Sequence, residues 1–252
     1  MNNKSGIFAK CNLPQGRSFL FSILSLVVLA GGVVLLFSEI PHARAAAPTL
    51  GLIGHWKFDE VIGTAAADSS GNNRTGTLTN GPLWTLGKIS NALSLDGVND
   101  YVSIPSTLDV AALPFTLSAW VSPSSYADYA TIIAKRTTYS PSGMRFGLLL
   151  QPGSGRVWLQ SYSSDTIFSY TPPLNTWTHI TVVANTANTQ LYVNGVLQQS
   201  LGAFTLGTGA TAQMRIGNVP DGPDQYAGKL DDVRVYNRAL STSEIVGVMA
   251  GN

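Results

Sequence analysis

Apolar and polar residues alternate with a period of two along much of the chain after residue 50, a pattern that predicts β-strands. The clearest example is the segment 115–122, which sets an apolar face against a polar or aromatic one: Phe115, Leu117, Ala119 and Val121 against Thr116, Ser118, Trp120 and Ser122. The same alternation continues at 176–184, 190–193 and 215–217. We expect one face of each strand to pack into a core.

Two local signals punctuate this pattern. Asn194-Gly195 separates two short apolar runs, and this dipeptide favours a type I′ hairpin because both turn positions need a positive φ. Near the C-terminus, the segment 241–244 (Ser-Thr-Ser-Glu) has the sequence of a capping box. It predicts one short helix that packs through Ile245, Val246 and Met249.

The N-terminal part of the chain is different. Residues 18–37 carry no charge and are numerous enough to cross a bilayer as a helix. The basic segment 1–17, with Lys4, Lys10 and Arg17, precedes them and predicts a cytoplasmic N-terminus. Residues 18–37 are therefore predicted to form a hydrophobic helix, either a signal peptide or a transmembrane anchor.

The segment 38–50 decides between these two fates. Ala43-Arg44-Ala45 and Ala45-Ala46-Ala47 both match a small-residue cleavage site. Cleavage would give a secreted domain, whereas an uncleaved helix would attach the domain to the membrane as a single-pass anchor. Both fates place residues 51–252 outside the cytoplasm or at the cell surface.

Charge and cysteine content narrow the possible partners. The chain has 15 Lys and Arg against 14 Asp and Glu, so it lacks the basic surface of a nucleic-acid-binding protein. Cys11 is the single cysteine and precedes the apolar segment. Residues 51–252 can therefore form no disulfide among themselves and must be held together by a core, with or without a bound metal.

Four segments, in order along the chain, carry a family resemblance. They are 51–60 (Gly-Leu-Ile-Gly-His-Trp-Lys-Phe-Asp-Glu), 68–72 (Asp-Ser-Ser-Gly-Asn), 92–102 (Ala-Leu-Ser-Leu-Asp-Gly-Val-Asn-Asp-Tyr-Val) and 230–241 (Leu-Asp-Asp-Val-Arg-Val-Tyr-Asn-Arg-Ala-Leu-Ser). Together they resemble the LamG-like jelly rolls of the concanavalin A-like lectin/glucanase superfamily. The resemblance implies that residues 51–252 form one all-β domain, a two-sheet antiparallel jelly-roll sandwich with one short C-terminal helix. The fold hosts sugar binders, adhesion modules and glycanases, so it does not settle the function.

Catalytic motifs are absent from the sequence. Glucanases of this superfamily carry carboxylates two residues apart, as in Glu-x-Asp-x-Glu, so that both face one cleft. The pairs Asp59-Glu60 and Asp231-Asp232 are adjacent instead, and neighbouring residues of a strand point to opposite faces. There is also no Gly-x-Ser-x-Gly, His-Glu-x-x-His or phosphate-loop motif. We therefore expect a protein that is not an enzyme, with glycoside hydrolysis as the less favoured reading.

The candidate ligand-binding residues are aromatic and polar. In the segment 156–162, Val157 and Leu159 take one face, and the opposite face carries Arg156, Trp158, Gln160 and Tyr162. An aromatic plane can stack on a sugar ring while Arg and Gln bond its hydroxyls. We place Tyr129, Arg136 and Tyr139 in nearby loops, together with Tyr126, Asp128 and Asp165. The prediction is a non-catalytic module that binds carbohydrate or mediates cell-surface adhesion.

Two alternatives stay open at this point. Trp158 could instead pack beneath a loop or against Trp120. The whole domain could equally bind protein, or serve as a structural surface sandwich with no sugar ligand.

A calcium site is a further possibility at the C-terminal strand. Alternation puts Asp231 on the same face as Val233 and Val235, where a buried carboxylate needs a partner. Ca²⁺ takes six to eight oxygen ligands, and the resemblance implies a structural ion near the first and last strands. The candidate ligands are Asp59, Asp68, Asn72 and Asp231. In the alternative reading, Asp231 accepts bonds from turn amides or pairs with Arg234 or Lys229.

Overall fold

The computed structural model describes residues 46–105, 108, 110–126, 129–222 and 224–251 in full, and residues 24–29 and 32–37 by their backbone alone. The chain divides into two units, Met1–Ala43 and Arg44–Asn252. In the described part of the chain, no helix is long and apolar enough to span a membrane.

Within the first unit, β1 (Leu24–Leu29) pairs antiparallel with β2 (Gly32–Phe37). The expectation of a helix over 18–37 is wrong for these residues, and the rest of that segment lies outside the described residues. Each strand contains a Val-Val pair, and Gly31-Gly32 lies between the two runs. Adjacent β-branched residues favour extended backbone, and glycines favour a hairpin turn between strands.

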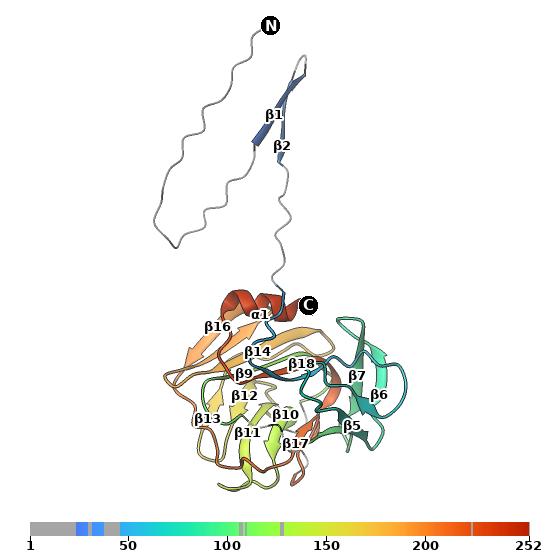
Figure 1. The fold of residues 1–252 in the computed structure, drawn as a ribbon, viewed down its shortest axis with the longest axis vertical. Helices are drawn as coiled ribbons and strands as arrows, with labels where there is room; N and C mark the ends of the chain where they lie inside the picture. The colour runs from blue at the N-terminus through green and yellow to red at the C-terminus, as the bar shows by residue number, and fades with distance from the viewer. Residues whose placement is uncertain are drawn as a thin grey trace. The chain divides into compact units, whose positions relative to one another are not determined.

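The second unit contains two antiparallel sheets (Figure 1). The front sheet has the order β13 (Asp165–Ile167), β12 (Val157–Gln160), β11 (Met144–Leu150), β10 (Ala130–Arg136), β17 (Met214–Ile216), β8 (Tyr101–Ile104), β5 (Gly76–Thr79) and β4 (Ala65–Ala66). The back sheet has the order β16 (Val196–Leu201), β15 (Thr189–Val193), β14 (Thr178–Ala184), β9 (Phe115–Pro123), β18 (Ala227–Tyr236), β7 (Asn91–Asp96) and β6 (Leu83–Leu86), and β3 (Leu52–Trp56) also pairs with β18.

The core lies between the two sheets. The apolar face predicted for β9 enters it, so that Phe115 packs on Phe146 of β11 with ring centroids 5.5 Å apart. Leu148 and Leu159 enter the same core from the front sheet. The predicted fold, an antiparallel jelly-roll sandwich of two sheets, is confirmed.

Both local signals are confirmed. Asn194 and Gly195 have φ values of 49° and 79° and join β15 to β16, as a type I′ turn requires. Helix α1 (Thr242–Met249) begins after the N-cap Ser241 and has a capping box with Glu244. It lies on the outer face of the back sheet, away from the core (Figure 1), where the Trp120 indole donates to the Met249 carbonyl at 3.2 Å.

The packed face of α1 differs from the prediction in one position. Ile245, Gly247 and Val248 are its buried residues, whereas Val246 is 38% exposed. Ile245 and Val248 are three apart and therefore share a face of the helix, which adjacent Ile245 and Val246 do not.

Strand β18 contains a β-bulge that corrects a second prediction. Asp231 is opposite Trp120 and Arg234 is opposite Ser118, so β18 uses one more residue than β9 over this stretch. The extra residue is Asp232, with a φ of 50°. The bulge reverses the alternation, so Val233 enters the core while Asp231 shares the outer face with Trp120. The expectation that Asp231 shares a face with Val233 is therefore wrong.

Candidate functional site

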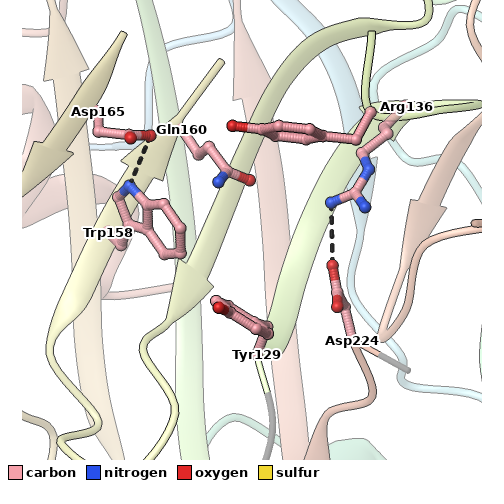
Figure 2. Close-up of a pocket in the computed structure, with 7 residues that line it drawn as sticks. Tyr129, Arg136, Trp158, Gln160, Asp165 and Asp224 are labelled. Atoms are coloured by element: carbon pink, nitrogen blue, oxygen red, sulfur yellow. Dashed lines mark hydrogen bonds and ion pairs between the residues drawn. The ribbon is translucent and has the colours of Figure 1, made fainter. Parts of the chain in front are cut away.

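A pocket of about 330 Å³ lies on the outer face of the front sheet (Figure 2). Its lining combines three aromatic rings, an amide, a guanidinium and two carboxylates: Tyr129, Trp158, Tyr139, Gln160, Arg136, Asp165 and Asp224. Six of them come from strands β10, β12 and β13 and from the loops that flank β10, and Asp224 comes from the connection between β17 and β18.

Alternation along β12 directs two of these side chains into the pocket. Val157 and Leu159 enter the core, so Trp158 and Gln160 point outward. Gln160 is paired with Gly147 of β11 on one side and with Asp165 of β13 on the other.

Aromatic contacts hold the Trp158 ring in place. Its centroid lies 5.8 Å from that of Tyr129, and its indole N–H donates to Asp165 Oδ1 at 3.1 Å. Tyr139 stacks on Tyr162 with centroids 5.3 Å apart. Burial, reinforced by the Asp165 carboxylate, raises the pKa of Tyr139, so its hydroxyl stays protonated at neutral pH and can donate to a ligand.

Arg136 anchors the other side of the pocket. Its Nη1 lies 2.9 Å from Asp224 Oδ2, and its Nε lies 2.8 Å from Asp221 Oδ1. The guanidinium also lies over the Tyr139 ring, 5.3 Å from the centroid. These contacts fix the guanidinium as part of the wall.

Gln160 stands out within the pocket. Its side chain points between Trp158 and Arg136 (Figure 2), yet the residue is only 6% exposed. Within the described ranges, no hydrogen bond is formed by its amide. The amide N and O are not fully buried, so they reach the surface of the pocket, where water or a ligand can bond them. Gln160 is thus positioned to bond a polar group that enters the pocket.

The structure gathers five of the predicted ligand-binding residues around this pocket: Tyr129, Arg136, Tyr139, Trp158 and Gln160. Tyr162 lies behind Tyr139 and is 43% exposed. Arg156 does not line the pocket, because it precedes β12 and its Nε donates to Gln151 Oε1 at 3.1 Å.

Other predictions about these residues are also resolved by the structure. Trp158 packs on Tyr129 rather than on Trp120, which contacts His179 on the back sheet. Asp224 was missed by the sequence reasoning. It is separated from Arg136 by 88 positions, and only the polar turn around Asp221 marked the region.

A serine–histidine pair lies elsewhere, in the back sheet. Ser118 Oγ and His179 Nε2 are 2.9 Å apart, but the two residues are only 1% and 0% exposed. Burial lowers the pKa of His179 to about 3, so the imidazole stays neutral at physiological pH. A substrate has no access to this pair, which serves as a buried hydrogen-bonded contact beneath the helix layer.

Asp231 has partners in a turn. Its Oδ2 accepts hydrogen bonds from the Lys88 and Ile89 amides, both at 2.8 Å. Burial raises the pKa of Asp231 to about 7. The turn-amide alternative considered from the sequence describes this carboxylate.

The remaining calcium candidates also bond to nearby chain. Asp68 accepts from the amides of His55, Ser70 and Arg74, and Asn72 donates to the Leu52 carbonyl. Asp59 accepts from the Asn91 amide at 3.3 Å. Over the described residues, no three His, Cys, Asp or Glu side chains are grouped to hold a metal. Asp231 Oδ1 is buried without a hydrogen-bond partner in the described part of the chain, and calcium stays a prediction.

Comparison with known proteins gives one family match. The family model Laminin_G_3, described as the concanavalin A-like lectin/glucanases superfamily, matches residues 96–246. The curated proteins contain no match to this sequence.

Solved structures show the same fold. Domain 4 of AbnA, a GH43 extracellular arabinanase from Geobacillus stearothermophilus solved with arabinotriose, is 25% identical with a TM-score of 0.63; the match covers 79% of this chain and 98% of that one. The ligand-binding domain of botulinum neurotoxin serotype D with N-acetylneuraminic acid is 19% identical with a TM-score of 0.61, and the match covers 81% of this chain and 52% of that one. Trypanosoma rangeli sialidase with sialic acid is 19% identical with a TM-score of 0.59, over 81% of this chain and 33% of that one. This chain thus spans about half of the toxin domain and a third of the sialidase.

Proposed function

The chain belongs to the concanavalin A-like lectin/glucanase superfamily, and we propose that its jelly roll is a non-catalytic module that binds carbohydrate in the Trp158 pocket. The observation that carries the proposal is the pairing of Trp158 with Gln160 on one wall. Trp158 is held by its neighbours and only 7% exposed, and the part of its ring that lines the pocket offers an apolar surface. The Gln160 amide, which has no partner among the described side chains, offers both a donor and an acceptor at the pocket surface. A sugar ring presents the complementary C–H face and hydroxyls.

The other lining groups support a polyhydroxylated ligand. Asp165 can accept hydrogen bonds, and the Tyr139 hydroxyl can donate one. A cavity of about 330 Å³ falls at the lower end of the usual range for small-molecule sites. Domain 4 of AbnA, solved with arabinotriose, lends further support because it is matched over nearly its whole length.

A hydrolase is disfavoured by the roles of the pocket carboxylates. Glycoside hydrolysis needs one protonated and one ionised carboxyl on opposite sides of the bond that breaks. The Asp224 carboxylate forms an ion pair with the Arg136 guanidinium at 2.9 Å. Asp165 accepts from the Trp158 indole and is not part of a carboxylate pair.

The domain is proposed to work outside the cytoplasm. The uncharged segment 18–37, its basic flank and the cleavage motifs at 43–47 support export, either as a secreted protein or on a single-pass anchor. The structural similarity to domain 4 of AbnA, an extracellular arabinanase, supports this location.

Glycan binding by the full chain tests the proposal. We expect signal from at least one oligosaccharide on an array, and a loss of roughly tenfold or more in affinity for Gln160→Leu, which keeps the volume but removes the amide. Arg156→Ala is the matched control, since Arg156 is next to β12 but outside the pocket. An array without any bound glycan, or equal losses in both variants, would favour a protein-binding or structural sandwich instead.

A further inference from the structure

The pocket carries an excess of negative charge. Its lining includes two carboxylates, of Asp165 and Asp224, and a single guanidinium, that of Arg136. A third carboxylate, of Asp221, also contacts this guanidinium. Arg136 is engaged on two sides by Asp224 and Asp221, and it also lies over Tyr139. Arginine is the usual partner of a ligand carboxylate because its fork bonds both oxygens at once. Here two of the three guanidinium nitrogens, Nη1 and Nε, already contact protein carboxylates.

Asp165 has a different environment. It is an exposed residue at the start of β13, and the Trp158 indole donates to its Oδ1. Across the described ranges, no Lys, Arg or His forms an ion pair with its carboxylate. Because the indole N–H is neutral, the negative charge of Asp165 next to the Trp158 ring is not compensated.

Arg215, on β17 of the same sheet, does not change this balance. Its guanidinium lies 4.0 Å from the Tyr101 centroid and donates to Asn218 Oδ1 and Gln213 Oε1, both at 3.1 Å. It is not among the residues that line the pocket. A ligand stacked on Trp158 therefore meets Asp165 first.

We propose that this pocket selects saccharides without a carboxylate and rejects those that carry one, with Asp165 as the specificity-determining residue. The proposal rests on the proposed carbohydrate function and assigns its ligand class. An uncharged sugar donates hydroxyl hydrogens to Asp165. A uronic or sialic acid brings a second carboxylate to the same place, where repulsion and the loss of a donor both oppose binding.

The experiment compares neutral saccharides with acidic counterparts. The probes are trigalacturonic acid and its methyl ester, lactose and 3′-sialyllactose, and arabinotriose as a neutral pentose trimer. Binding of the full chain is measured by array and then by calorimetry at low and high salt. We expect each neutral member to bind at least about fivefold more tightly than its acidic counterpart at low salt, and the gap to shrink as salt screens the repulsion.

Asp165→Asn tests how much of the preference for neutral ligands comes from the charge of Asp165. Asparagine has nearly the same shape and keeps an oxygen that accepts from the Trp158 indole, so it removes the charge while the ring stays in place. We expect this variant to lose most of the preference for neutral ligands. Asp96→Asn makes the same change in net charge on β7 of the back sheet, where Asp96 accepts only from the Val98 and Asn99 amides. It should leave the preference unchanged.

The outcomes separate this proposal from the proposed function. Acidic probes that bind as tightly as neutral ones, or a preference that survives Asp165→Asn, would overturn the assignment of ligand class while carbohydrate binding stands. If none of the probes and no array glycan binds, both proposals fail together.

Discussion

The Trp158 indole donates its N–H to the Asp165 carboxylate at 3.1 Å, diagonally across strands β12 and β13. This bond fixes the plane of the ring against the Tyr129 ring and turns its outer face toward the pocket. The stacking surface is therefore rigid before a ligand arrives, and a rigid surface loses less conformational entropy on binding.

Trp158→Phe should weaken glycan binding several-fold, and Trp158→Ala should weaken it by roughly thirtyfold or more, since central aromatic anchors contribute about 2 kcal/mol or more. Phenylalanine keeps an aromatic face but cannot donate to Asp165. Calorimetry on the full chain gives both affinities, and near-ultraviolet circular dichroism checks that each variant is folded. Equal affinities for all three proteins would remove Trp158 from the site.

Arg136→Gln should lower the free energy of unfolding by about 2 kcal/mol, because it leaves the Asp221 and Asp224 carboxylates facing one another without their guanidinium. Their partial contact with solvent reduces the penalty below that of a fully buried pair. Urea denaturation measures the change. Adding Asp224→Asn to Arg136→Gln should restore part of the loss, and a double variant less stable than Arg136→Gln alone would contradict this account.

Asp231→Asn should stabilise the domain, and more so at pH 8 than at pH 5. Burial raises the pKa of Asp231 to about 7 in the fold, against about 3.9 in an unfolded chain. Ionisation therefore costs stability progressively as pH rises between these values, and the cost is absent below the lower one. We expect a gain of about 2 kcal/mol at pH 8 and less at pH 5.

Thermal melts of both proteins across pH 4–8 check this difference. His55 and His179 have lowered pKa values in the fold and so also make stability depend on pH, but both are present in each protein and cancel in the comparison. Asp231→Ala is the contrasting variant, since it leaves the Lys88 and Ile89 amides without an acceptor and should destabilise at every pH. A stability difference between Asp231→Asn and the natural chain that does not vary with pH would contradict the raised pKa.

Calcium at the Asp59 and Asp231 end of the sandwich is tested by melting the full chain in Ca²⁺ and in a chelator. If the ion binds there, a hundredfold excess over Kd should stabilise by about 2.7 kcal/mol, and Asp59→Asn should abolish the gain. Identical melting temperatures under the two conditions would leave Asp231 as a partner of turn amides alone.

Mass spectrometry of the mature protein decides the fate of the segment 18–37. A new N-terminus at Ala46 or Pro48 would indicate cleavage and secretion, whereas an intact N-terminus in the membrane fraction would indicate an anchor. Recovery of the intact chain in the cytosolic fraction would contradict export altogether.

Alternation and turn chemistry predicted the parts of this fold that depend on neighbouring residues. The inward face of β9, the Asn194-Gly195 turn and the Ser241 cap are all local. The outward direction of Trp158 and Gln160 followed from the same rule.

Features that depend on tertiary pairing were not predictable in this way. Arg136 and Asp224 meet although 88 positions separate them, and no local pattern links them. Arg156 alternates correctly with Trp158, but β12 begins only at Val157, so the rule does not extend to it. The face of Asp231 was assigned wrongly because a bulge is set by pairing with β9 rather than by composition.

Because of that bulge, the residues of β18 that face the core change from even-numbered to odd-numbered positions. Leu230 faces inward before Asp232, and Val233 and Val235 face inward after it. The neighbouring strand β9 has no such change, and its odd-numbered residues from 115 to 121 face inward.

Removing Asp232 would let Val233 pair opposite Ala119, with Val233 still facing inward and Arg234 still facing outward. The extra residue is therefore not needed for the alternation. What its loss would remove is a buried carboxylate that bonds His55 Nε2 at 2.6 Å and Arg234 Nη2 at 3.0 Å, so the bulge adds an ion-paired side chain to the strand without disturbing the core on either side of it.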